Sequence, residues 1–172
     1  MPMRYALSTG APIDVYQATT QMTDESGQTY PLHIDTLLDN ALGTNAYYGV
    51  FTANIHSDSS SSQPMSDAIV SSAKTRGVAV VSAKQMLDWL DGRNGSTFSG
   101  IAWAGNTLSF SVLAGRGATG LQALVPVQVG TLHLTGITLN SAPVTYTVQT
   151  IKGVSYAFVA AAAGQYRASY AF

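Results

Sequence analysis

The chain has 172 residues and a formal net charge of −1, with 46% hydrophobic and 10% charged residues. This length suits one large or two small domains, and the apolar content excludes a disordered chain. The near-neutral charge excludes nucleic acid as a general partner, and the lack of cysteine excludes disulfides and thiolate metal sites.

The first part of the chain predicts alternating strands and helices. Ile13–Met22 is rich in β-forming residues and is followed by a turn signal at 24–27. His33–Leu42 places apolar residues at helical spacing, and Gly43 can end that helix. Tyr47–Ile55 is a continuous apolar run, which is typical of a strand buried on both faces.

The alternation continues beyond that strand. Ser66 can cap a second helix that ends at Gly77, Val78–Ala83 is a short apolar strand, and Lys84–Leu90 is a last helix. Strands that alternate with helices are usually parallel and joined by crossovers. We therefore predict that residues 1–95 form an α/β segment of parallel strands and crossover helices, arranged as part of a barrel-like sheet.

From residue 96 onward the apolar residues alternate with a period of two, as in strands. About six or seven short strands, separated by turns about every 8–12 residues, are typical of an immunoglobulin-like β-sandwich. We therefore predict that residues 96–172 form an all-β accessory domain of this type. The alternating positions include Ile101 and Trp103; Leu108, Phe110 and Val112; Val144, Tyr146 and Val148; Tyr166, Ala168 and Tyr170.

The acidic residues are confined to the first part of the chain. All nine lie before residue 92, and only three basic residues and no acidic residue follow residue 95. A segment without carboxylates cannot supply a carboxylate acid–base pair or a carboxylate calcium site. Chemistry of these kinds is therefore predicted in the first part.

His56 is the sharpest candidate for chemistry. It follows a predicted strand, and ligands of parallel α/β sheets bind at the C-terminal ends of strands. An imidazole there can act as a general acid or base, and Asp14 on an adjacent strand could orient it. We therefore predict His56 and Asp14 as catalytic residues. The alternative is a solvated loop histidine beside the serine run 57–62.

The segment from about residue 12 to residue 92 resembles the closing units of NodB-type polysaccharide deacetylases. In that family a late strand ends in Leu-x-His, whose histidine is the general acid, and a polar loop, a helix, a short strand and a last helix follow. The corresponding tripeptide here is Asn54-Ile55-His56, in which Asn54 replaces the leucine that lines the acetyl pocket. Asp14-Val15-Tyr16 corresponds to a family element that pairs an aspartate with an aromatic residue.

The resemblance implies a secreted or cell-surface protein that hydrolyses N- or O-acetyl groups on a polysaccharide, with Tyr16, Asn54 and Asp58 at the substrate. The family's Asp-Asp element and its His-x-x-x-His metal ligands have no counterpart in this sequence. We therefore expect the C-terminal portion of a longer protein, inactive alone and without a cofactor of its own. A divalent metal such as zinc would belong to the full-length parent.

Two other interpretations remain open. The chain could be a non-catalytic surface or carbohydrate-binding module, or a stand-alone small α/β enzyme, although no phosphate loop or nucleophile motif is found. The expected partners are a polysaccharide and a second copy of the chain, because parallel strands taken from a larger sheet leave an open edge. No membrane span is expected, because no run approaches the roughly 20 apolar residues that cross a bilayer.

Overall fold

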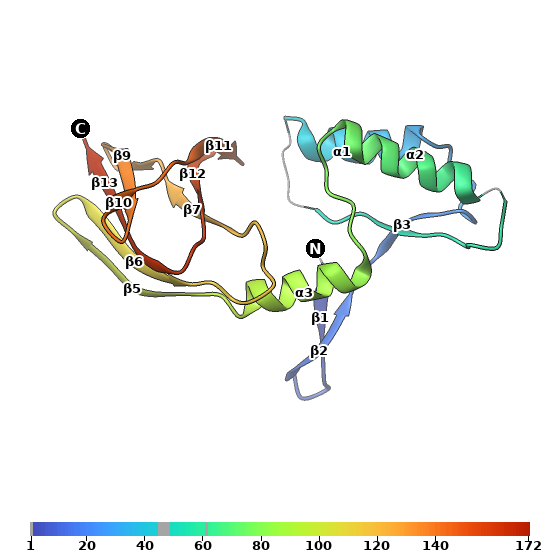
Figure 1. The fold of residues 1–172 in the computed structure, drawn as a ribbon, viewed down its shortest axis with the longest axis horizontal. Helices are drawn as coiled ribbons and strands as arrows, with labels where there is room; N and C mark the ends of the chain where they lie inside the picture. The colour runs from blue at the N-terminus through green and yellow to red at the C-terminus, as the bar shows by residue number, and fades with distance from the viewer. Residues whose placement is uncertain (1, 45–48, 61) are drawn as a thin grey trace. The chain divides into compact units, whose positions relative to one another are not determined.

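The computed structural model describes residues 2–44, 49–60 and 62–172. The chain divides into two compact units, Met1–Val81 and Ser82–Phe172 (Figure 1). Strands outnumber helices, and three helices occur among the described residues. None of these helices is long and apolar enough to cross a membrane.

The first unit begins with a β-hairpin. Strands β1 (Met3–Ala6) and β2 (Pro12–Gln17) pair in antiparallel fashion. The single strand that the sequence predicts over Ile13–Met22 is therefore two strands, because the chain leaves β2 at Gln17 and starts β3 at Thr20. The reason is a change of partner, since β2 pairs with β1 whereas β3 pairs with a later strand.

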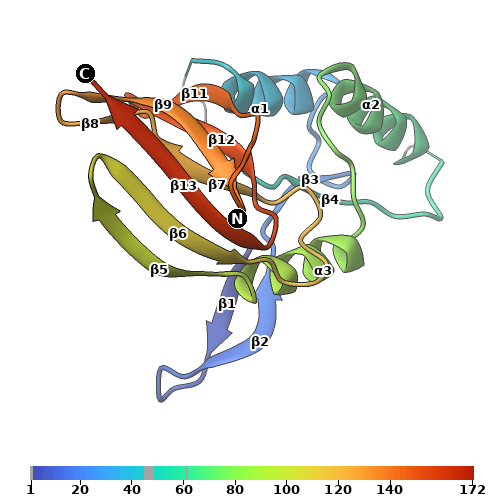
Figure 2. The same ribbon diagram turned by 60° about the vertical axis from the view of Figure 1, so that its left-hand side comes forward.

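The rest of the first unit is a strand–helix–strand–helix arrangement. Strands β3 (Thr20–Thr23) and β4 (Thr52–Asn54) are parallel, and helix α1 (Leu32–Leu42) connects them. Helix α2 (Ser62–Thr75) follows, and both helices lie on the same side of the two strands (Figures 1 and 2). The prediction of parallel strands joined by a crossover helix is confirmed for this pair. The buried core residues are Met22, Ile34, Leu38, Met65, Ile69 and Ala73.

Three predicted boundaries differ from the structure. Of the strand predicted over Tyr47–Ile55, only Thr52–Asn54 forms a strand, β4, among the described residues. Positions 47 and 48 lie outside the described residues. Helix α2 begins before Ser66, whose hydroxyl donates to the Ser62 carbonyl one turn earlier. The strand predicted over Val78–Ala83 is absent from the described structure, and Val80 and Val81 are exposed, because no neighbouring strand pairs with this segment.

The described parallel sheet is therefore two strands wide, and no barrel-like sheet is seen in the described part of the first unit.

The second unit begins with helix α3 (Ala83–Asn94), which extends the helix predicted over Lys84–Leu90. Ser82 and Gln85 cap its start with reciprocal side-chain to backbone hydrogen bonds. The strands that follow are β5 (Thr97–Ala104), β6 (Thr107–Leu113), β7 (Gln122–Pro126), β8 (Gln128–Val129), β9 (Leu132–Leu139), β10 (Ala142–Pro143), β11 (Thr147–Ile151), β12 (Val154–Ala160) and β13 (Gly164–Ala171).

These strands form two sheets that share one core. The larger sheet is curled and has the order β10-β9-β13-β6-β5, with β8 also paired to β9 (Figure 2). The smaller sheet has the order β11-β12-β7. This is the sandwich-like packing expected from the period of two, and the buried residues come from both sheets: Phe110, Val112, Ala123, Val125, Ile137, Ala157, Val159, Ala161, Tyr166, Ala168 and Tyr170.

The strand order differs from that of an immunoglobulin domain. In an immunoglobulin domain the last strand, G, lies at the edge of the sheet formed by strands C, F and G. Here the last strand, β13, lies in the middle of the larger sheet between β6 and β9. Tyr166 and Tyr170 on β13 point into the core, and their hydroxyls donate to the carbonyls of Ala160 and Pro126, respectively.

Helix α3 packs closely on the loop between β6 and β7. A Cβ atom at Gly92 would lie 2.6 Å from the Arg116 carbonyl oxygen, so only glycine allows this approach. Trp89 Nε1 donates to the Thr119 carbonyl at 3.1 Å. These contacts explain why α3 belongs to the second unit, which begins at Ser82. The sequence pattern instead predicted this helix as part of the first domain, residues 1–95.

Candidate functional site

The candidate site lies where the parallel strands β3 and β4 end. Thr23 and Asn54 are register partners at the C-terminal ends of these strands. Asp24 directly follows β3, and His56 comes two residues after β4. Because the C-terminal ends of parallel strands meet at the same edge of a sheet, these two side chains are brought together.

Both carboxylate oxygens of Asp24 are engaged. Oδ1 lies 3.0 Å from Nδ1 of His56, and Oδ2 accepts a hydrogen bond from the His56 backbone N–H at 3.1 Å. The hydroxyl of Ser62, at the start of α2, also donates to Oδ2. The Asp24 side chain is only 8% exposed, whereas the His56 side chain is 51% exposed. A buried carboxylate therefore holds an imidazole that remains open to a ligand.

The electrostatics of the pair favour an ionised carboxylate beside a protonated imidazole. Hydrogen bonds from Ser62 and His56 lower the pKa of Asp24 far below its ordinary value and outweigh the opposing effect of burial. The hydrogen bond to Asp24 raises the pKa of His56, and the negative charges of Asp24, Glu25 and Asp58 raise it further. The imidazolium form is thereby stabilised toward neutral pH.

The hydrogen bond also determines which ring nitrogen faces the ligand. An ionised carboxylate only accepts hydrogen bonds, so Nδ1 of His56 must carry the proton that points to Asp24. In the imidazolium form Nε2 carries the second proton. On a half-exposed side chain of this kind, Nε2–H can donate a proton to a bound substrate and can later take one back.

A shallow, open depression of about 540 Å³ adjoins the pair. Most of its described lining residues carry a hydroxyl, amide or carboxylate group, but polar and apolar atoms contribute similar shares of its wall, and no lysine or arginine occurs among these residues. The lining residues are Ile55, His56, Ser57, Asp58, Ser59, Ser60, Ser62, Gln63 and Ser66.

The carboxylate that contacts His56 belongs to Asp24, whereas the sequence predicted Asp14. Asp14 lies on β2 and pairs with Arg4 at 3.2 Å, and its side chain is largely exposed. The guanidinium of Arg4 also donates to the Tyr16 hydroxyl at 2.8 Å and lies over the Tyr16 ring. The prediction failed because the strand beside β4 is β3, whereas Asp14 belongs to the preceding hairpin.

The other predicted residues divide between the depression and its surroundings. Asp58 lines the depression, and its contact with a substrate stays a prediction. Asn54 ends β4 with an exposed side chain and is not among the residues found to line it. Tyr16 lies on the hairpin with Asp14.

Sequence reasoning missed Asp24 and Ser62. The sequence pattern indicates only a turn at Asp24. Its position directly after a β-forming run is the signal that could have identified it as a site residue. Ser62 had been counted with the solvated serine run, although its side chain is buried.

No metal site of the family type is seen in the described part of the chain. Within residues 2–44, 49–60 and 62–172, no group of three or more His, Asp or Glu side chains is arranged to hold a metal ion. His33 is half-buried, and its Nε2 contacts the Gln21 carbonyl oxygen at 3.2 Å. That ring supports the start of α1 and is not a ligand candidate.

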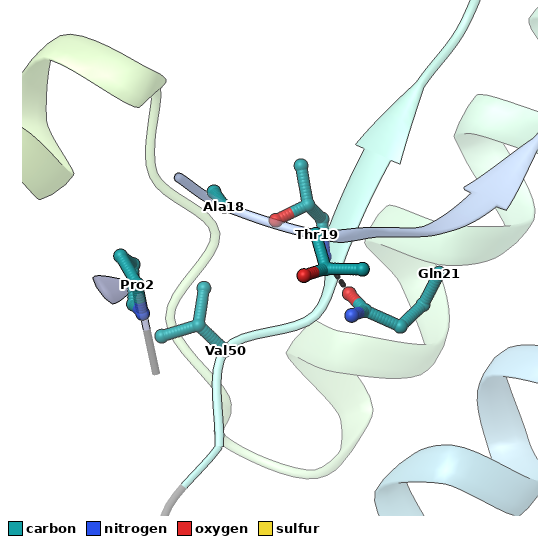
Figure 3. A pocket seen from close by; sticks show the side chains of 6 residues that line it. Pro2, Ala18, Thr19, Gln21 and Val50 are labelled. Atoms are coloured by element: carbon teal, nitrogen blue, oxygen red, sulfur yellow. Dashed lines mark hydrogen bonds between the residues drawn. The ribbon is translucent and has the colours of Figure 1, made fainter. Parts of the chain in front are cut away.

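A second, smaller depression of about 40 Å³ lies beside the start of β3 and β4 (Figure 3). The Gln21 side chain accepts a hydrogen bond from the Thr52 backbone N–H at 2.8 Å there, and so bridges the irregular pairing of the two strands. Its described lining residues include no charged group, and their only hydroxyls are those of Thr19 and Thr52. It is therefore a structural gap in the first unit and offers no acid–base chemistry.

Comparison with known proteins finds no matching family model, no matching curated protein and no matching solved structure.

Proposed function

We propose that Asp24 and His56 form the general-acid pair of a carbohydrate-active hydrolase that acts in the manner of polysaccharide deacetylases. The observation that supports this most directly is the buried Asp24 carboxylate bonded to Nδ1 of the half-exposed His56. The resemblance of Asn54-Ile55-His56 to the family's late Leu-x-His element supports the same assignment. The resemblance also supports an exported, cell-surface or secreted location.

In this proposal, Nε2 of His56 supplies the proton for the leaving group. Water attacks the acetyl carbonyl carbon and releases its protons to the surrounding solvent. The bond from the carbonyl carbon to nitrogen or oxygen breaks as Nε2 gives its proton to the departing atom, and the ring then regains a proton from solvent. Asp24 stabilises the imidazolium before the transfer and keeps the ring oriented. The products are acetate and a free amine or hydroxyl on the polysaccharide.

The pair supplies only part of such a site. We assign no base for the attacking water, and the described residues hold no metal-ligand cluster. We therefore propose that this chain contributes the proton donor within a longer protein. The isolated chain should release no acetate from acetylated chitooligosaccharides or xylan, with or without added Zn²⁺. Release above a blank, abolished in His56→Gln, would contradict this part of the proposal.

The proton donor itself can be tested by NMR titration of the histidine rings. His33→Gln and His133→Gln variants assign the signals by elimination. We expect a raised pKa for His56 in the wild type, a lower one in Asp24→Asn, and shifts of the His56 and Gln63 signals on addition of an acetylated chitooligosaccharide. An ordinary pKa for His56, or no response to any acetylated saccharide, would overturn the assignment.

A second candidate function is carbohydrate binding by the second unit without catalysis. Edge strand β5 exposes 56% of Phe98 and 45% of Trp103, and no charged residue occurs in this strand. The Trp103 ring rests on the Tyr170 ring, with centroids 5.2 Å apart, so it is held as a platform. Trp103→Ala should abolish retention on insoluble polysaccharide if this surface binds sugar, whereas His56→Gln should not affect it.

We also propose that copies of the chain associate through the first unit. In the described part of the first unit the parallel sheet has two strands, whose outer edges leave backbone groups that can pair with another chain. Sedimentation at tens of micromolar should show a dimer or larger species. A monomer that persists over the whole concentration range would contradict this.

A further inference from the structure

Ser62 is the most deeply buried polar side chain near the candidate site. It is the first residue of α2, and only 2% of the residue is exposed. Its hydroxyl donates to Oδ2 of Asp24. The other serines that line the depression are less buried, so Ser62 differs from its neighbours in the serine run.

The two oxygens of the Asp24 carboxylate have different partners. Oδ2 accepts from the His56 backbone N–H and from the Ser62 hydroxyl, whereas Oδ1 faces Nδ1 of His56. A carboxylate is planar, so fixing Oδ2 in the interior also fixes the direction in which Oδ1 points. The 3.0 Å contact between Oδ1 and Nδ1 therefore depends on the contacts made by Oδ2.

The Ser62 contact also bears on where the proton of the pair resides. A hydroxyl donor stabilises the ionised carboxylate relative to the protonated one. The two donors at Oδ2 stabilise the negative charge of the carboxylate, so transfer of the Nδ1 proton to Oδ1 is disfavoured. The arrangement therefore keeps the proton on the imidazole, where a general acid needs it.

We propose that Ser62 is a positioning residue, which holds the Asp24 carboxylate so that Oδ1 orients His56 and the proton stays on the ring. This role rests on the proposed function of the pair. It also joins α2 to the site, because Ser62 begins that helix while Gln63 and Ser66 of the same helix line the depression.

The test is a comparison of Ser62→Ala with Ser66→Ala. Ser66 lies one turn later and lines the same depression, but its hydroxyl donates to the Ser62 carbonyl. In Ser62→Ala we expect the pKa of His56 to fall toward its ordinary value and the slowly exchanging Nδ1–H signal to be lost. In Ser66→Ala the pKa of His56 and the Nδ1–H signal should both match those of the wild type.

Ser62→Cys is a second variant for the same measurement if Ser62→Ala does not fold. Ser62→Cys retains a side chain of similar size with a weaker donor, and the pKa of His56 should lie between those of the wild type and Asp24→Asn. An unchanged or raised pKa of His56 in a folded Ser62 variant would overturn the positioning role. An ordinary pKa of His56 in the wild type would instead overturn the proposed function itself.

Discussion

His56 and Asp24 close the C-terminal ends of two parallel strands with a 3.0 Å contact between Nδ1 and Oδ1. The same carboxylate accepts the backbone N–H of His56, so the ring and the main chain of one residue are held by one partner. This double contact ties the residue after β4 to the end of β3, and no described residue bonds to Nε2 of the ring.

The pair should make stability depend on pH in two ranges. The pKa of His56 is raised above 6.5, so its contribution is complete below that pH and is lost as the pH rises through the folded-state pKa. The pKa of Asp24 is lowered below 3.8, so its contribution is complete above that pH and is lost as the pH falls through the folded-state pKa. Both contributions are complete between these two ordinary values.

Urea unfolding followed by far-UV circular dichroism checks this from about pH 4 to about pH 9. The wild type should lose stability on the alkaline side of this range, and Asp24→Asn and His56→Gln should lose less. An equal alkaline loss in all three proteins would show that the pair does not cause it.

Asp14 and Asp24 should differ sharply in their effect on His56. Asp24→Asn removes the carboxylate that contacts the ring, so the pKa of His56 should fall. Asp14→Asn removes an exposed partner of Arg4 on the hairpin and should leave the His56 titration unchanged. NMR titration of the two variants measures this difference, and an equal effect would mean that the hairpin carboxylate also acts on the site.

Gly92→Ala should destabilise the second unit. The new Cβ would meet the Arg116 carbonyl oxygen at 2.6 Å and the Ala118 backbone nitrogen still closer, so α3 or the loop must move. We expect a loss of about 1–3 kcal/mol in the free energy of unfolding, as for other overpacked sites. Trp89 fluorescence reports the change, because its ring bonds to the same loop.

Gly136→Ala is the matched control for that experiment. No atom lies within 4 Å of a Cβ built at Gly136 in β9, so its effect should stay within about 0.5 kcal/mol. Equal effects of the two substitutions would show that the close approach at Gly92 does not matter for stability.

Tyr170→Phe should weaken the connection between the two sheets. The Tyr170 hydroxyl donates to the Pro126 carbonyl on β7 at 2.8 Å, and its loss leaves that carbonyl without this donor. We expect a cost of about 0.5–1.5 kcal/mol, measured by thermal unfolding. Tyr156→Phe is the control, since no described residue bonds to that hydroxyl, and a cost as large as that of Tyr170→Phe would argue against the assignment.

The sequence by itself determined the elements whose pattern is local. The apolar spacing of 33–42 predicted α1, and the period of two after residue 96 predicted strands packed on a shared core. His56 was predicted as a site residue because a polar loop after an apolar run is a local signal, although β4 itself is largely exposed. In each case neighbouring residues along the chain specify the feature.

Only the tertiary structure decided which strands are neighbours and which side chains therefore meet. It paired His56 with Asp24 and not with Asp14, because β2 turns back on β1 and leaves β3 to pair with β4. It placed α3 in the second unit through the close approach at Gly92. Contacts of this kind join residues far apart along the chain, so no periodicity or local spacing in the sequence records them.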